Sequence, residues 1–189
     1  KTTPVFVIGA QGIHPNVAAH LDYAAIMGGC VSCTTTLGAR LAGVTPTGTM
    51  PHALSLILGN TVRALDAFDR NTAQDVPRVA LVDTHRDEAE EAIAVSKSLG
   101  DRLRGIRLDT AAERGGVTPS LVREVRARLD LAGFKHVEIT ITGGLTPERI
   151  GQFIDAESPV QSFGVGAYIA SAAPNPYTAD IHEVDGRPM

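Results

Sequence analysis

Two residues on one predicted strand in the second half of the chain have side chains that could do chemistry. The strand with its polar end covers residues 105–110 and carries Arg107 and Asp109, which are separated by one residue. Because strand side chains repeat every two residues, this cation and this carboxylate project from the same face. A guanidinium and a carboxylate at one strand end can together bind anions and hydroxyl groups. The pair is therefore the first candidate for a functional site.

The next two predicted strands each end in a glycine-lined turn. The turns are Thr142-Gly143-Gly144 and Gly164-Val165-Gly166. Such turns leave backbone N–H groups open to a phosphate, and a helix that follows adds the positive end of its dipole. Polar strand ends followed by two glycine turns are typical of a barrel with its phosphate site on the last two strands. We therefore predict that these six residues bind phosphate.

Strands and helices that alternate along the chain must bring these residues together. Strands are expected at residues 5–9, 30–33, 47–50, 78–82, 105–108, 136–141 and 160–165, and helices at 15–27, 35–42, 52–68, 87–99, 119–131 and 147–154. This alternation predicts a parallel sheet with helices outside it. No G-x-G-x-x-G follows the first strand, which argues against a doubly wound nucleotide-binding sheet. We predict an open or incomplete, TIM-like α/β barrel of about seven parallel strands.

Composition excludes several classes of partner. The 189 residues fit one domain, and a net charge of −4 with no run of basic residues argues against nucleic acid. The chain has no Trp, which argues against a base-stacking platform. No signal peptide or membrane span is recognised, so we expect no membrane partner and a cytoplasmic protein. Because the chain starts without Met and ends in turn-like residues, we expect one domain of a longer protein.

Two other clusters have simpler explanations. Cys30 and Cys33 have the spacing of a redox or zinc pair, but they lie in an apolar segment without a second ligand pair. This favours a buried structural role and no metal site. Glu88, Glu90 and Glu91 are expected to form a solvated helix face.

The motifs at successive strand ends resemble those of the nicotinate phosphoribosyltransferases, and most closely the shorter bacterial and archaeal type. The resemblance runs from about residue 5 to 188. It rests on His14-Pro15, Gly28-Gly29-Cys30, the stretch from Gly48 to Ala53, Leu81-Val82-Asp83-Thr84, the stretch from Gly105 to Asp109 and the two glycine turns. The stretch from Gly48 to Ala53 and the Arg107/Asp109 pair are fairly specific together, whereas each glycine turn alone is weak. The resemblance implies a type II phosphoribosyltransferase-like barrel, with an N-terminal domain that is absent here.

Membership would imply a reaction of NAD biosynthesis. Nicotinate and phosphoribosyl pyrophosphate would form nicotinate mononucleotide and pyrophosphate. The ribose C1 becomes cation-like as pyrophosphate leaves, so Asp109, and after it Asp83, would favour that charge and bind the ribose hydroxyls. Arg107 would contact nicotinate. His14 and Thr49 are the other candidate substrate-binding residues.

His52 aligns with a histidine that ATP-coupled family members phosphorylate. The alternative is that His52 only contacts a phosphate or caps a turn. Mg²⁺ is expected on the pyrophosphate, through substrate oxygens and water. With ATP coupling, the enzyme would be a nicotinate-phosphate ligase. The resemblance also implies a homo-oligomer in which a neighbour's N-terminal domain completes the site.

The sequence departs from the family at Gln11 and Gly12, where an arginine is expected. An arginine there would bind phosphate or carboxylate. The expected substitutes are Arg40, Lys1 or a basic group from another region.

Two alternatives therefore remain. One is another phosphate-handling barrel enzyme, such as an aldolase or isomerase, although Lys97 and Lys135 are poorly placed for a Schiff base. The other is a non-catalytic domain for phosphoribosyl binding or assembly.

Overall fold

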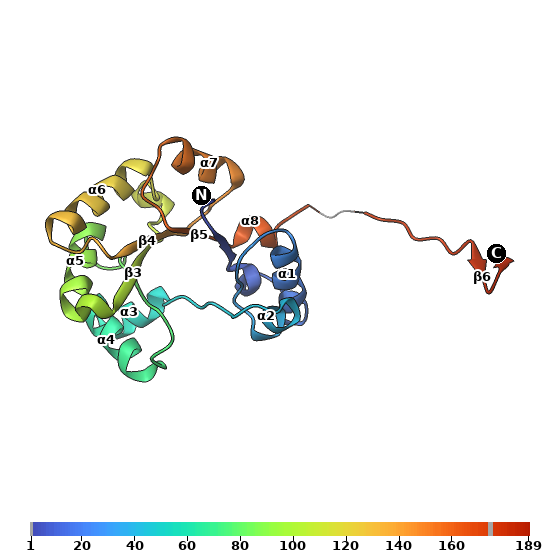
Figure 1. Cartoon of the computed structure of the whole chain (residues 1–189), viewed down its shortest axis with the longest axis horizontal. Coiled ribbons are helices and arrows are strands. Elements are labelled where there is room, and N and C mark those ends of the chain that lie inside the picture. Colours follow the sequence, from blue (N-terminus) through green and yellow to red (C-terminus); the bar gives the residue numbers. More distant parts are fainter. Residues whose placement is uncertain (1, 174–175) are drawn as a thin grey trace.

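The computed structural model describes residues 2–173 and 176–189 and is built around a parallel sheet (Figure 1). Its five strands are β1 (Val5–Val7), β2 (Arg78–Leu81), β3 (Leu103–Leu108), β4 (Glu138–Ile141) and β5 (Ser162–Val165). Their order is β1-β5-β4-β3-β2, and every neighbouring pair is parallel. The predicted fold class, a parallel α/β fold of the open-barrel kind, is confirmed.

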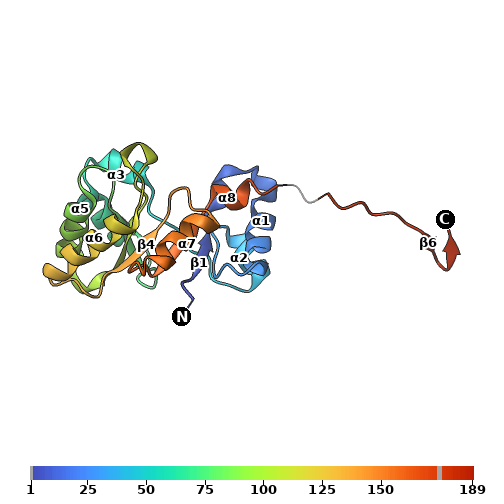
Figure 2. The ribbon, with the colours of Figure 1, turned by 90° about the horizontal axis from the view of Figure 1, so that it is seen from above.

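Helices connect the strands and cover the sheet. They are α1 (Pro15–Met27), α2 (Thr36–Ala42), α3 (His52–Leu58), α4 (Thr61–Asn71), α5 (Glu88–Leu99), α6 (Pro119–Leu131), α7 (Pro147–Asp155) and α8 (Ala167–Ala170). Short 3₁₀ turns occupy Gly9–Gly12 (η1), Gly100–Arg102 (η2) and Ala112–Arg114 (η3). Figure 1 shows α5 and α6 on the side of β3 and β4, and Figure 2 shows α1 and α2 beside β1. No helix among the described residues is long and apolar enough to cross a bilayer.

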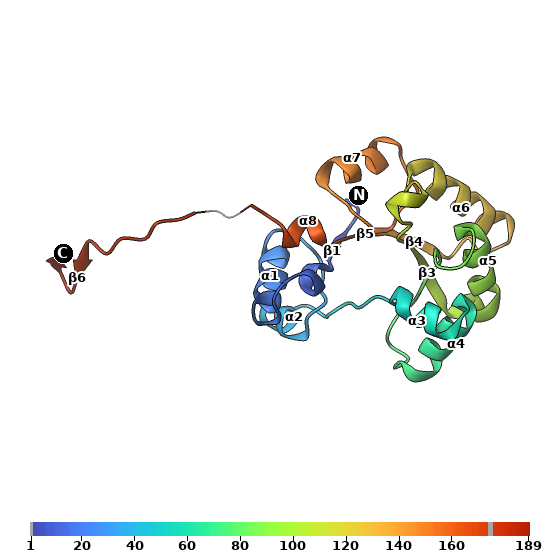
Figure 3. The ribbon, with the colours of Figure 1, turned by 180° about the vertical axis from the view of Figure 1, so that it is seen from behind.

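The C-terminal segment lies apart from the barrel. It ends in an antiparallel hairpin of β6 (Glu183–Val184) and β7 (Arg187–Pro188). Figure 3 shows this hairpin far from α8, at the end of the extended residues 176–182. The residues that form the site therefore come from the part of the chain before this segment.

Helix starts follow simple capping signals. Thr118 and Thr146 accept hydrogen bonds from backbone N–H groups in the first turns of α6 and α7, and a proline follows each of them. Asp87 caps α5 in the same way, with its side chain accepting from two backbone N–H groups. Such residues satisfy the otherwise unpaired N–H groups of a helix start. These caps explain why α1, α6 and α7 begin at the predicted prolines.

The two faces of the sheet differ in polarity. On β3, Ile106 and Leu108 are fully buried in the apolar core that the sheet shares with the helices. Arg107 projects to the opposite face, because successive strand side chains alternate. On that inner face the hydroxyls of Thr140 and Ser162 lie 2.8 Å apart. The interior is thus polar enough to accept a charged site.

Two predicted strands, at residues 30–33 and 47–50, do not form. The segment at Ser32 makes only one isolated bridge, to Phe6 of β1. Two backbone hydrogen bonds, from Val31 N–H to the Val5 carbonyl at 2.8 Å and from Val7 N–H to the Ser32 carbonyl at 3.0 Å, hold it to β1 without extending into a ladder. The Ser32 hydroxyl also donates to the Thr45 carbonyl at 2.8 Å and lies 2.7 Å from the Thr47 hydroxyl. The described sheet therefore has five strands instead of about seven.

The predicted helix at residues 52–68 is divided into α3 and α4. Gly59 ends α3 in a left-handed conformation with φ +68°, and the Asn60 side chain then caps α4. A glycine followed by asparagine is a stop signal followed by a start signal. The apolar periodicity continued through this pair and hid the break.

The prediction of a solvated glutamate face on α5 is wrong for two of its three residues. Glu91 is buried and accepts hydrogen bonds from the Thr61 hydroxyl and from the backbone N–H groups of His85 and Arg86. Glu88 is also buried and accepts from the Thr110 hydroxyl at 2.8 Å. These carboxylates order the loops after β2 and β3, because they replace water as partners for buried donors.

Candidate functional site

The carboxyl ends of the parallel strands lie at one edge, and most predicted site residues lie there. Asp83 follows β2 by two residues, Asp109 follows β3 directly, and Thr142 follows β4 directly. Strand pairing holds these ends together: Arg107 is in register with Leu81 on one side and with Thr140 on the other. Functional groups in barrels gather at this edge, because the loops that leave it are free to vary.

Arg107 is the buried centre of the site. Only 6% of its side chain is exposed. One nitrogen, Nη1, donates to Asp109 Oδ2 at 2.7 Å and to the Thr142 hydroxyl at 2.9 Å, while Nη2 donates to the Met50 carbonyl at 2.8 Å. A buried guanidinium needs such partners, because an unpaired charge in the interior is unfavourable. Arg107 thus links the ends of β3 and β4 to the segment at Met50, which is remote from both in the sequence.

Asp83 is tied at both oxygens. Its Oδ1 lies 2.9 Å from His52 Nε2, and its Oδ2 accepts from the backbone N–H of Asp109 at 2.6 Å. Burial raises the pKa of Asp83 above its ordinary value, and the nearby Asp109 charge raises it further, while His52 and the N–H of Asp109 oppose the shift. Asp83 therefore orients His52, whose side chain is 42% exposed.

An open cavity of about 600 Å³ lies against these residues. Four predicted site residues line it: Thr49, His52, Arg107 and Asp109. The wall opposite them includes residues of η1, α1 and the segment before α2, namely Ala10, Gln11, Pro15, Ala18, Thr34 and Thr35. We call this the catalytic cavity.

Eight of the twelve predicted site residues do not line the catalytic cavity, and His14 and Thr142 are two of them. His14 is exposed and caps α1, with its Nδ1 accepting from the backbone N–H of Asn16 at 3.2 Å. Thr142 is fully buried, and its hydroxyl binds Arg107. The structure thus gives both residues local roles, as a helix cap and as a support for Arg107.

The first glycine turn lies beside Asp109. Gly143 has φ +90° and Gly144 has φ +58°, a region that residues with side chains rarely adopt. A Cβ on Gly143 would lie 2.8 Å from Asp109 Oδ1. Arg149 of α7 donates to the carbonyls of Gly143 and Gly144 at 3.4 and 3.3 Å. Glycine is therefore needed at both positions, and the turn is held from behind.

The second glycine turn is packed against neighbouring residues, and its last glycine precedes helix α8. Gly164 faces the inside of the sheet, where a Cβ would lie 2.6 Å from Thr142 Cγ2 and 2.8 Å from the Phe6 ring. The Val165 side chain belongs to the apolar core. Gly166 begins α8 and packs close to Ile8. Among the three residues, Gly166 lies nearest to a helix start that an anion could use.

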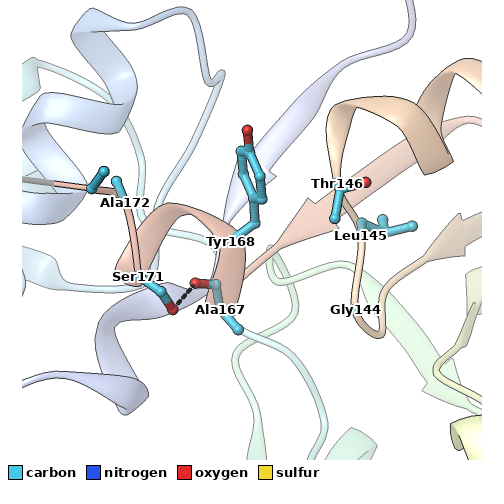
Figure 4. Close-up of a pocket in the computed structure, with 8 residues that line it drawn as sticks. Gly144, Leu145, Thr146, Ala167, Tyr168, Ser171 and Ala172 are labelled. Atoms are coloured by element: carbon cyan, nitrogen blue, oxygen red, sulfur yellow. Dashed lines mark hydrogen bonds between the residues drawn. The ribbon is translucent and has the colours of Figure 1, made fainter.

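A second cavity, of about 510 Å³, separates the two glycine turns (Figure 4). Gly144, Leu145 and Thr146 line one side, and Ala167 and Tyr168 of α8 line the other. In Figure 4 the Tyr168 side chain stands between the two walls. We call this the glycine cavity. It lies next to the starts of both α7 and α8, where helix dipoles are positive.

The largest of these cavities lies elsewhere, where β2 and β3 begin. It measures about 940 Å³ and includes Arg78, Arg102 and Arg104. Arg78 is buried and donates to Asp69 and to carbonyls of the loop between α4 and β2. Arg102 and Arg104 are paired with Asp69 and Glu138. These arginines are occupied in holding the fold together, so cavity size alone does not mark the site.

The arginine that the family pattern leads one to expect is replaced by Gln11, which lines the catalytic cavity. Arg40 lies on α2 and is not among the cavity residues. Lys1, the other proposed substitute, lies outside the described residues. Sequence reasoning also missed Thr34 and Thr35 in the cavity wall; the only signal was a run of threonines before a helix, which indicates a cap.

The cysteines and other metal-binding residue types form no evident centre. Cys33 is fully buried and Cys30 half-buried, and both are free thiols. Across the described residues, no group of three or more His, Cys, Asp or Glu side chains could hold a metal ion.

An open parallel barrel with this strand-end site places the chain among the phosphoribosyltransferase barrels. The model of the quinolinate phosphoribosyl transferase C-terminal domain matches residues 1–177, so the chain belongs to that family. It is 32% identical over 176 residues to a nicotinate phosphoribosyltransferase of Mycobacterium tuberculosis, which covers 92% of this chain and 37% of the relative.

Solved structures agree with this placement. The crystal structure of nicotinate-nucleotide pyrophosphorylase from Pyrococcus furiosus is 42% identical, with a TM-score of 0.88, over 99% of this chain and 47% of that one. A nicotinate phosphoribosyltransferase from Vibrio cholerae shares the fold, with a TM-score of 0.69 at 17% identity, over 89% of this chain and 42% of that one. The chain thus spans less than half the length of these relatives.

Proposed function

We propose that this domain carries the active site of a nicotinate phosphoribosyltransferase, which joins nicotinate to phosphoribosyl pyrophosphate and releases pyrophosphate. The observation that carries the proposal is the position of Asp109. It lines the catalytic cavity, and its Oδ1 also borders the Gly143 turn. A ribose held by Asp109 would direct its C1 into the cavity and its 5′-phosphate towards the glycine turns. The Asp109 carboxylate would then fix the orientation of the bound phosphoribosyl pyrophosphate.

The chemistry suits these groups. As pyrophosphate leaves, positive charge develops at the ribose C1, and a fixed carboxylate stabilises that charge without reorganising. Asp109 would supply it. Asp83 would act mainly through its partners, because its two oxygens are already bound to His52 and to the backbone of Asp109. Gly144 and Gly166 would offer backbone N–H groups to the 5′-phosphate.

The charge of the catalytic cavity favours nicotinate over quinolinate. Among the described residues that line the cavity, Arg107 is the only guanidinium, and its Nη1 is already bound to Asp109. Nicotinate has one carboxylate, whereas quinolinate has two, and each buried anion needs a partner. Gln11, in place of an arginine, is an uncharged donor suited to one carboxylate or to the ring nitrogen.

Mg²⁺ and ATP belong to the same proposal. The carboxylates at the strand ends are engaged by Arg107 and His52, so Mg²⁺ would be held by pyrophosphate oxygens and water. His52 projects from the start of α3 and is held at Nε2, which leaves Nδ1 for a phosphoryl group from ATP. The ATP-free alternative has His52 contact the pyrophosphate directly.

The assembly is also a proposal. The Pyrococcus furiosus and Mycobacterium tuberculosis proteins are more than twice as long as the part that this chain matches. We propose a homo-oligomer in which a further domain, contributed by a neighbouring subunit, covers the catalytic cavity.

The direct test is pyrophosphate release by the complete gene product. With phosphoribosyl pyrophosphate and Mg²⁺, we expect turnover with nicotinate and little with quinolinate or nicotinamide. Asp109→Asn keeps the shape but not the charge, so kcat should fall by about 100- to 1,000-fold, as for other lost electrostatic contacts to a transition state. No turnover with any of the three pyridines would remove the proposal.

A second candidate is a binding domain without catalysis, which Gln11 favours because a strong anion contact is replaced. Calorimetry separates the two. Binding of phosphoribosyl pyrophosphate without turnover would support the binding domain.

A further inference from the structure

Asp22, in the middle of α1, is a fully buried carboxylate with no cation bound to it among the described residues. Its Oδ2 accepts from the backbone N–H of Thr35 at 2.7 Å and from the Thr34 hydroxyl at 3.5 Å. Its Oδ1 has no hydrogen-bond partner. Burying a carboxylate without a counter-charge is unfavourable, so packing alone does not account for an aspartate here.

The residues bound to Asp22 form a wall of the catalytic cavity. Thr34 and Thr35 both line it, and Thr35 also caps α2 with its hydroxyl. The contact is tight, because a Cβ on Gly38 would lie 2.7 Å from the Asp22 Cβ. Asp22 is thus fixed on one helix and holds the start of the next.

No strand ladder fixes this wall. The segment before Thr34 makes one isolated bridge to β1, through Ser32. It is joined to the following loop by the Thr47 N–H, which donates to the Cys33 carbonyl at 2.8 Å. That loop leads to Thr49 and His52 in the opposite part of the cavity. The position of the wall therefore depends on a few backbone hydrogen bonds and on side-chain contacts, and among the described side-chain contacts Asp22 supplies the only charged one.

The pKa values of the two cysteines near Asp22 respond to its charge. Burial raises the pKa of Cys33, and the negative charge of Asp22 raises it further. The same two causes raise the pKa of Cys30. The thiols thus stay protonated beside the carboxylate, where a thiolate would add a second negative charge.

We propose that Asp22 is a positioning residue for substrate binding, which holds the Thr34–Thr35 wall against the pyridine in the catalytic cavity. This inference rests on the proposed function. Because the wall contacts bound substrate without taking part in bond breaking, its loss should weaken ground-state and transition-state binding alike. Such a change raises KM and leaves kcat unchanged.

The test compares Asp22→Ala, Asp22→Asn and Val95→Ala in the complete gene product. Asp22→Ala removes the acceptor of the Thr35 N–H, so KM for nicotinate should rise about tenfold, with kcat within about twofold. Asp22→Asn keeps an oxygen acceptor, and KM should stay within about threefold of the wild type. Val95→Ala removes buried volume from α5, away from the cavity; it should lower Tm and leave KM unchanged.

Hydrogen exchange of residues 33–36 gives a readout that needs no activity. Exchange should be faster in Asp22→Ala than in the wild type and unchanged in Val95→Ala, because only the first frees the Thr35 N–H. The proposal would be overturned if folded Asp22→Ala had an unchanged KM for nicotinate. It would also be overturned if Val95→Ala raised this KM as much as Asp22→Ala does. If the wild type turns over no pyridine, the proposed function fails, and the substrate role of Asp22 fails with it. Unchanged exchange would refute the positioning contact itself.

Discussion

The barrel from β2 to β5 and the region from residue 28 to 51 hold their parts of the site in different ways. In the first, paired strands fix Arg107 and Thr142, and an apolar core backs them. In the second, an isolated bridge and side-chain hydrogen bonds through Asp22 and Ser32 position the wall. The proposed reacting group Asp109 is thus built on paired strands, whereas the proposed substrate contacts Thr34, Thr35 and Thr49 come from a segment outside the described sheet.

The largest effect should come from removing the charge at the centre of the barrel from β2 to β5. Arg107→Ala leaves Asp109 and the Thr142 hydroxyl without their donor in a buried place. We expect a loss of about 3–5 kcal/mol in the free energy of unfolding, measured by urea titration, together with loss of turnover.

Arg104→Ala is the matched control on the same strand. Its side chain is 64% exposed and pairs with Glu138, so we expect at most about 1 kcal/mol. Equal losses for the two arginines would mean that the buried network does not hold the site.

As pH rises through the pKa of Asp83, kcat/KM should rise and the contribution of Asp83 to folding stability should fall. Burial raises its pKa above the ordinary value of about 3.9 for an aspartate. As pH falls through that raised pKa, Asp83 gains a proton and releases His52, so kcat/KM should fall. Stability runs the other way: the contribution of Asp83 is full below pH 4 and is lost as pH rises through the raised pKa.

Asp83→Asn tests this assignment, because it cannot titrate. The acidic limb of the kcat/KM profile should disappear, and the remaining rate should be about 100-fold lower. The stability of the variant relative to the wild type should increase as pH rises from 4. If the acidic limb of the kcat/KM profile persisted unchanged in Asp83→Asn, the pKa of that limb would belong to another group.

The smallest expected effect is that of substituting Gly164. A packing role and a phosphate-binding role of this glycine lead to different expected outcomes. Gly164→Ala places a methyl group against Thr142 and Phe6, which should cost about 1–3 kcal/mol of unfolding free energy. Gly151→Ala in α7 meets nothing within 4 Å and should stabilise by roughly 1 kcal/mol. If Gly164→Ala instead raised KM for phosphoribosyl pyrophosphate without a loss of stability, Gly164 would be a phosphate contact.

Much of the barrel from β2 to β5 could be predicted from the sequence. The apolar strands β2 to β5 and the proline-started helices α6 and α7 carry local signals, and Arg107 and Asp109 share a face through simple alternation. The break at Gly59 and Asn60 was also encoded locally, although the apolar pattern masked it.

The region from residue 28 to 51 could not be predicted in the same way. Residues 30–33 and 47–50 have the composition of strands, but their few backbone hydrogen bonds, such as those of Val31 and Ser32 with β1, do not extend into a ladder. The Ser32 hydroxyl instead binds the remote Thr45 carbonyl. The burial of Glu88 and Glu91 was missed for the same reason, because their partners lie on other loops.

The most direct test of this account is a crystal structure of the complete gene product with phosphoribosyl pyrophosphate bound. We predict ribose hydroxyls within hydrogen-bonding distance of Asp109, C1 facing the catalytic cavity, and the 5′-phosphate on the backbone N–H groups of Gly144 and Gly166. A phosphate found instead among Arg78, Arg102 and Arg104, at the opposite edge of the sheet, would contradict it.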